Sequence, residues 1–145
     1  MKYELTDETN GSGLRRIRAL RDIPRYGVNE GDLGGWVESE GNLTQEGDCW
    51  VFDNAQVCGN ARVFGNAQVC GNARVYGNAM VCGNARVFDA VVCGNARVCD
   101  NARVFGNARV FGNAMVCGNA HVFDNAQVFD NAQVFDAAVC GGVTS

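Results

Sequence analysis

The chain has 145 residues, a length that suits a single domain. Its net charge of −4 at pH 7 is too small to indicate a protein that coats nucleic acid or binds a membrane surface. Almost every aliphatic residue after position 50 is Val, and Gly occurs 19 times. This composition disfavours helices, because β-branched side chains lose rotamer freedom in a helix and Gly costs backbone entropy there. We therefore expect an all-β protein.

The sequence also bears on the compartment. No apolar stretch is as long as a membrane-spanning helix, and the first residues, MKYELTDETN, lack the basic and then apolar segments of a signal peptide. We expect a cytoplasmic protein, or one in the host cytoplasm if a phage encodes it, with reduced thiols and no contact with a membrane.

Residues 1–32 do not repeat and form the first predicted unit. Segments 2–9 and 14–23 flank Asn10-Gly11-Ser12-Gly13, a strong turn signal between two strands. Stacked repeats leave an open sheet edge at each end, and such edges need protection. We predict a β-hairpin cap over residues 1–32, followed by a repetitive domain over residues 33–145.

The second unit repeats every six residues from Val51, as in VFDNAQ VCGNAR VFGNAQ VCGNAR. Ala and Val lie two positions apart in each repeat, so both side chains point to one side of a short strand. The residue between them, such as Gln56 or Arg62, faces the other way. The Gly-Asn pair supplies a corner, because both residues tolerate positive φ. Val37 and Leu43 are expected to occupy inward positions of an irregular first coil.

These motifs resemble the hexapeptide-repeat family. The resemblance covers residues 33–145 and implies a left-handed parallel β-helix with a triangular cross-section and about six coils of about 18 residues each. The segment GDLGGWVESEGNLTQEGDCWV with its GNARV arrays is also similar to bacterial and phage GNARV-repeat proteins, some of which are labelled polymer-forming or transferase-like. That similarity implies a phage origin. Two units, 88–92 and 135–139, lack the Asn, and we expect a tightened corner in each.

Three units per coil predict which outward residues stack. One predicted column contains Trp50, Gln68, Arg86, Arg103 and His121. Arg86 and Arg103 are neighbours in it, and like charges directly opposed on a sheet are normally destabilising. One interpretation is an anion-binding site formed by the two arginines and flanked by His121 and Trp50. The other is a solvated face on which salt screens the guanidinium groups.

The residue after each repeat Val is Phe, Tyr or Cys. These side chains either stack at partly buried corners or form three exposed aromatic ridges, and the sequence leaves both possibilities open. The eight Cys form no C-x-x-C pair and exchange with Phe in one slot, which is typical of a small buried hydrophobe. Cys82, Cys99 and Cys117 stack within possible disulfide range. We nevertheless predict no metal site, because structural zinc needs four converging ligands, and no cofactor.

For function, we predict a rigid, non-enzymatic scaffold that docks on a host protein or protein–nucleic-acid complex and inhibits it, for example a defence nuclease or a CRISPR effector. Cap residues Arg15, Arg16 and Arg18 are further candidates for contact with an acidic partner. One alternative is a hexapeptide-type acyltransferase with His121 as its base. Another is a self-assembling structural protein. The last coil has no visible cap, so we also expect a homodimer that pairs through it.

Overall fold

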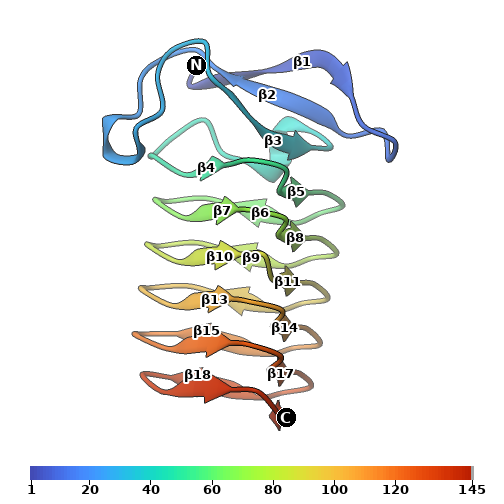
Figure 1. Ribbon diagram of the computed structural model, residues 1–145, viewed down its shortest axis with the longest axis vertical. Coiled ribbons are helices and arrows are strands. Elements are labelled where there is room, and N and C mark those ends of the chain that lie inside the picture. The colour runs from blue at the N-terminus through green and yellow to red at the C-terminus, as the bar shows by residue number, and fades with distance from the viewer. Residues whose placement is uncertain (145) are drawn as a thin grey trace.

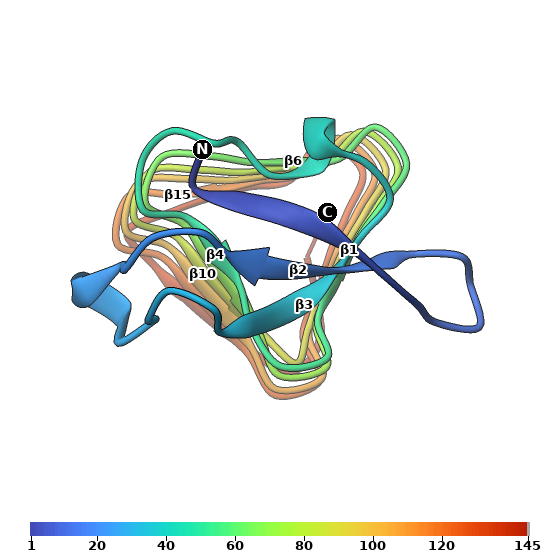
Figure 2. The same ribbon diagram turned by 90° about the horizontal axis from the view of Figure 1, so that it is seen from above.

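The repeats form short parallel strands that stack into three sheets, the three sides of a triangular coil (Figures 1 and 2). The computed structural model describes residues 1–144. Seen from the N-terminal end, the chain runs counterclockwise as it recedes from the viewer, so the coil is left-handed (Figure 2). One sheet has six strands, one from each coil, which confirms the predicted architecture.

The three sheets take every third strand of the repeat domain. The six-stranded sheet holds β4 (Trp50–Val51), β7 (Gln68–Cys70), β10 (Arg86–Phe88), β13 (Arg103–Phe105), β16 (His121–Phe123) and β19 (Ala138–Cys140). The five-stranded sheet holds β6 (Arg62–Val63), β9 (Met80–Val81), β12 (Arg97–Val98), β15 (Met115–Cys117) and β18 (Gln133–Phe135). The nine-stranded sheet holds β5 (Gln56–Val57), β8 (Arg74–Val75), β11 (Val91–Val92), β14 (Arg109–Val110), β17 (Gln127–Val128) and β20 (Val143–Thr144), together with three strands nearer the N-terminus.

Those three strands include the predicted cap hairpin. Strands β1 (Tyr3–Thr9) and β2 (Arg15–Ala19) are antiparallel, and β2 pairs antiparallel with β3 (Leu33–Val37). Strand β3 then pairs parallel with β5, so the hairpin extends one sheet of the coil and crosses its open end (Figure 2). Two short 3₁₀ turns, η1 (Pro24–Tyr26) and η2 (Glu40–Asn42), complete this end of the molecule.

Hydrogen bonds tie the cap to the first coil. The buried Lys2 Nζ donates to the carbonyl oxygen of Cys49 at 2.7 Å, and the Tyr3 hydroxyl donates to the carbonyl of Leu43 at 2.5 Å. Burial lowers the pKa of Lys2, although the neighbouring Cys49 acts in the opposite direction. The two bonds satisfy polar groups that the hairpin removes from water, as buried polar groups require.

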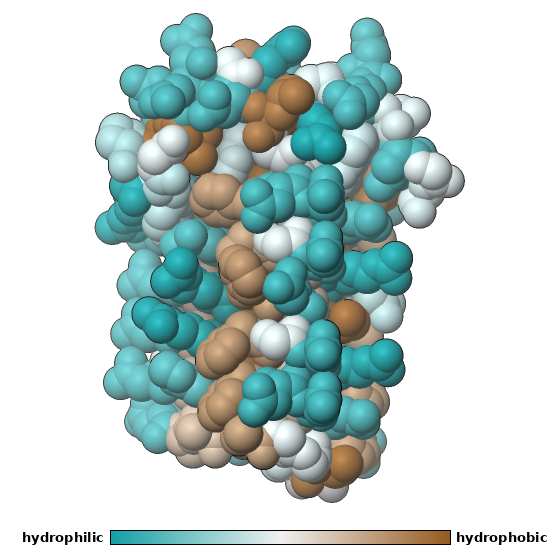
Figure 3. Space-filling view, viewed as in Figure 1, coloured by the Kyte–Doolittle hydropathy of each residue, from teal (hydrophilic) through white to brown (hydrophobic). Residues whose placement is uncertain are grey.

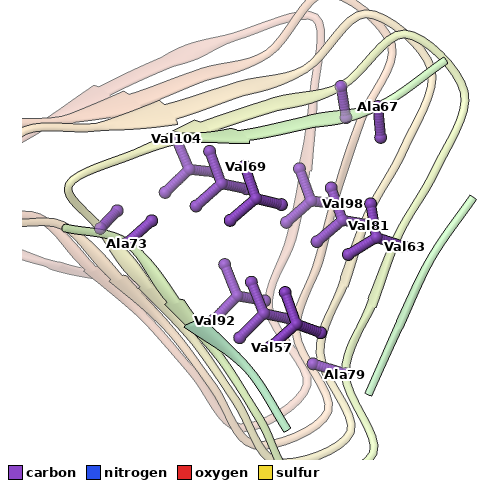
Figure 4. Packing of buried hydrophobic residues seen from close by; sticks show 14 of the residues in the cluster. Val57, Val63, Ala67, Val69, Ala73, Ala79, Val81, Val92, Val98 and Val104 are labelled. Carbon is purple, nitrogen blue, oxygen red and sulfur yellow. The ribbon is translucent and has the colours of Figure 1, made fainter. Parts of the chain in front are cut away.

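The core is the predicted interior of Ala and Val. From Ala55 to Val134 every repeat Ala and Val is at least 95% buried, and Val37 and Leu43 are fully buried as expected. The valines stack one above another along each sheet, with the alanines nearer the corners (Figure 4). Two small side chains per repeat suffice because each side chain packs on the same type in the coils above and below.

The corners depend on backbone that Gly adopts without strain. Gly94 has a φ of +67°, and a Cβ added there would lie 2.9 Å from the nitrogen of Gly112 in the next coil. Asparagines of successive coils also bond to one another at two corners, for example Asn78 Nδ2 to Asn95 Oδ1 at 3.2 Å. Corner stacking therefore continues the register that the core sets.

In each of the two short units, a hydrogen bond to an aspartate side chain preserves this register. Asp89 and Asp136 have φ values of +61° and +53°. Their Oδ1 atoms accept from the backbone N–H groups of Asn72 at 2.7 Å and Asn119 at 2.8 Å. In six-residue units the corresponding N–H donates to a backbone carbonyl of the next coil, as Asn78 does to Gly94 at 2.8 Å. The carboxylate thus replaces a lost acceptor, and the prediction of two tightened corners is confirmed.

Gly94 and Gly141 form a matched pair that separates backbone strain from close stacking. Gly141 has nearly the same φ, +68°, with nothing within 4 Å of an added Cβ. We expect Gly141→Ala to cost about 1 kcal/mol of unfolding free energy from the left-handed backbone alone. Gly94→Ala should cost at least about twice as much, because the methyl group also strikes the next coil. Urea denaturation followed by circular dichroism measures both, and equal losses would contradict the stacking argument.

Candidate binding face

The six-stranded sheet carries the predicted column of outward residues in the predicted order. Arg86 pairs in register with Arg103, and Arg103 pairs with His121. Gln68 lies between Trp50 and Arg86. Parallel in-register strands bring these side chains to neighbouring positions about 4.8 Å apart. The column assignment is therefore confirmed.

Trp50 does not face solvent, and its predicted place beside the anion site is wrong. Only 1% of its surface is exposed, and its ring meets the edge of the Tyr3 ring with centroids 6.3 Å apart. The cap covers strand β4, so the outward side of the first coil becomes interior. A Trp in a slot that otherwise holds Gln, Arg or His was the one available signal of this cover, because large aromatic side chains gain most from burial.

Arg86 and Arg103 are exposed and lack acidic partners. All five ion pairs within residues 1–144 involve an arginine of the cap. Together with Phe88, Val104 and Phe105, the two arginines line a shallow groove with a volume of about 230 Å³. Two adjacent guanidinium groups next to the partly exposed rings of Phe88 and Phe105 can hold a carboxylate or another oxyanion. The planar guanidinium group can donate two parallel hydrogen bonds to such a ligand.

The three cap arginines that were predicted to contact an acidic partner instead bind groups of this same chain. Arg15 lies 3.5 Å from the carboxylate of Asp7, and Arg18 donates to Glu4 at 2.8 Å. Arg16 donates to the carbonyl of Gly34 at 2.9 Å, with its guanidinium carbon 4.2 Å from the centre of the Trp36 ring. These contacts hold the hairpin together. The arginines that remain without a carboxylate are those of the repeats.

His121 lies next to Arg103 and is partly exposed. Its ring meets the edge of Phe105 with centroids 6.4 Å apart. Among the described residues no side chain or carbonyl is hydrogen-bonded to the imidazole, whereas a catalytic His is usually oriented by such a partner. His121 therefore lies next to Arg103, beside the residues that line the groove.

The side chains at the corners follow neither of the two simple alternatives. Phe105 stacks on Phe123 with centroids 5.2 Å apart, and Phe111 stacks on Phe129 at the same spacing. Cys70 and Cys117 are buried, however, while the side chains that follow them one coil later, Phe88 and Phe135, are 47% and 51% exposed. Both exposed Phe begin a short unit. Figure 3 shows one face of the molecule, on which an apolar column runs along the coil axis between polar residues.

The repeat, the triangular coil and the handedness together define a hexapeptide-repeat left-handed β-helix. The YdcK beta solenoid repeat family model matches residues 55–71, 67–82, 96–110 and 108–124. An Escherichia coli strain K12 protein called "Uncharacterized acetyltransferase YdcK" is 45% identical over 49 residues. That match covers 33% of this chain and 14% of the relative, so the similarity concerns a small part of the relative's length.

None of the helical segments within residues 1–144 has the length and apolar character needed to cross a bilayer.

The like-charge contact between Arg86 and Arg103 predicts that replacing one of them will stabilise the protein. Arg86→Gln should raise the free energy of unfolding by about 0.5 kcal/mol at low ionic strength, because it removes a like-charge contact and leaves the side chain that Gln68 already contributes to the column. The gain should vanish at high salt, where the repulsion is screened. Arg97→Gln is the control, because Arg97 is flanked in register by Met80 and Met115. An equal gain in the control, measured by urea denaturation, would contradict the pair repulsion.

Proposed function

We propose that the protein is a binding scaffold and that its arginine-bearing face docks on an acidic protein surface. The observation that carries this proposal is the unneutralised, in-register pair Arg86 and Arg103. Such a pair lowers stability when the protein is alone, and a bound carboxylate would remove that cost. Phe88 and Phe105 border the same groove and add apolar contact area of the kind that interfaces use.

An acidic protein fits this face better than a nucleic acid does. The chain carries a net charge of −4, and after position 51 it has six Arg and six Asp, so no extended basic stripe forms. Two neighbouring arginines can still grip one or two carboxylates. The rigid coil adds little ordering cost on binding, which favours affinity.

The wider role proposed here is that of a phage-encoded inhibitor acting in the host cytoplasm. The resemblance of the repeats to bacterial and phage GNARV-repeat proteins supports the origin, and the rigid coil with its adjacent Arg86 and Arg103 supports the mode of action. A defence nuclease or a CRISPR effector is an example of such a target.

The binding proposal is tested with a fluorescent poly-glutamate peptide and a single-stranded DNA oligonucleotide of equal charge. We expect the peptide to bind more tightly, and the double variant Arg86→Gln/Arg103→Gln to weaken its binding at least about tenfold, with loss of the salt dependence. Arg62→Gln/Arg97→Gln is the matched control, because it removes the same charge from arginines that Met80 separates. Equal weakening in both doubles, or preference for the oligonucleotide, would refute the proposal.

Acetyl transfer is the second candidate, and the description of the Escherichia coli relative as an acetyltransferase is the observation that favours it. His121 is the histidine of this chain and would act as the general base. Its neighbours Arg103 and Phe105 would then border the acyl-acceptor site.

An assay with acetyl-CoA and a panel of amine acceptors tests this candidate. If the chain transfers acetyl groups, His121→Ala should reduce turnover at least about 100-fold, since general-base catalysis contributes that much or more. Gln133→Ala is the control, because Gln133 fills the same outward slot on another sheet. Equal turnover in the parent and His121→Ala would remove His121 as the base.

Self-association is a separate proposal. Strands β18, β19 and β20 form the last coil, in which Phe135 and Val143 are 51% and 66% exposed. Open strand edges with exposed apolar side chains favour pairing with a second copy, either as a closed dimer or as a longer assembly.

A further inference from the structure

Three cysteines stack at one corner of the coil, next to the five-stranded sheet. Val81, Val98 and Val116 pair in register across β9, β12 and β15, and the residues that follow them are Cys82, Cys99 and Cys117. Cys117 is 2% exposed, whereas Cys99 is partly exposed. Solvent therefore reaches this cysteine column from one side.

The carboxylate of Asp100 lies close to two of these thiols. One ligand atom each from Cys99, Asp100 and Cys117 lies within 4.8 Å of the other two. Asp100 occupies a corner slot that is Gly in most units, with a φ of +59°. Its Oδ2 accepts from the backbone N–H of Gly118 at 3.0 Å, which directs the carboxylate toward the coil that carries Cys117. The carboxylate is held there before any ligand arrives.

We propose that Cys99, Asp100 and Cys117 form a binding site for a thiophilic divalent cation of the zinc and cadmium type. A metal–sulfur bond of about 2.3 Å allows two sulfurs on one ion to be separated by up to about 4.6 Å, so a small side-chain rotation brings all three ligands into reach. Two thiolates and one carboxylate suit such an ion, and a water molecule completes four-coordination on the open side.

Binding exchanges protons for the metal. Each thiol loses its proton to solvent as its sulfur bonds to the ion, so one divalent cation displaces two protons and no oxidant is needed. At neutral pH the metal competes with a proton at each sulfur, so the affinity for the metal should rise with pH.

The bound ion would join adjacent coils, because Cys99 follows β12 and Cys117 ends β15. A ligand that binds only the folded coil stabilises it by mass action. This site is independent of the arginine face, which lies on the six-stranded sheet.

The test is a titration of the reduced full-length chain with Cd²⁺, followed by the thiolate-to-cadmium charge-transfer absorbance in the near ultraviolet. The parent carries Cys140→Ala, because the exposed Cys140 lies 3.0 Å from an Asp124 oxygen and could bind cadmium itself. We expect one equivalent to bind, with a rise in Tm and a stronger affinity at higher pH. Cys99→Ala and Cys117→Ala should each weaken binding at least about tenfold, and Asp100→Asn, which keeps an oxygen for Gly118, should weaken it less.

Cys93→Ala is the matched control, because Cys93 fills the same slot with Tyr76 and Phe111 as its column neighbours. It should leave the titration unchanged. Circular dichroism and urea midpoints without metal verify folding, and Cys117→Phe replaces Cys117→Ala if the latter unfolds, since Phe135 fills this slot one coil later. Absence of the charge-transfer band in the parent, or equal binding in Cys99→Ala, would overturn the proposal.

Discussion

In-register stacking of small side chains inside a three-sided coil is the constraint on which the rest of the structure depends. Ala and Val are small enough for three sheets to meet around one interior, and each packs on the same residue type in the coils above and below. One repeat buries too little apolar surface to fold alone, so stability comes from contacts between coils. Every coil must then have nearly the same size. The aspartates at positive φ in the two short units meet this demand by replacing a lost backbone acceptor.

The same constraint places like residues next to each other outside the coil. Asparagines gain from this arrangement, because an amide group both donates and accepts and can bond to its neighbours on both sides. Stacked guanidinium groups can only donate, and stacked thiols are only weak donors and weak acceptors. Arg86 above Arg103, and Cys99 above Cys117, therefore have unused capacity for a ligand, which an anionic group or a thiophilic cation would fill. The proposed anion-binding face and the proposed cation site both follow from that chemical difference between the stacked columns.

The cap and the coil are stabilised in different ways. Each ion pair of the described chain includes an arginine of the cap. In addition, the Tyr3 hydroxyl donates to the Leu43 carbonyl, and the Arg16 guanidinium lies over the Trp36 ring of β3. The cap arginines are consequently occupied by contacts within the cap and with the residues that follow it. The coil has arginines on its outer surfaces without carboxylate partners, so a charged partner has more to gain from binding the coil than from binding the cap.

The sequence by itself determined the repeating part of this protein. A six-residue period with Ala and Val two apart specifies the inward face, because this follows from local spacing repeated many times. The three sheets and the register that brings Arg86 to Arg103 followed from the resemblance to the hexapeptide-repeat family, which implies three units per coil. The turn signal at residues 10–13 likewise determined the hairpin. Only the tertiary structure decided the burial of Trp50, the pairing of Arg15, Arg16 and Arg18, and the place of Asp100 beside two thiols. Those features depend on where the non-repeating cap lies and on side-chain direction at corners, and neither is encoded in the period.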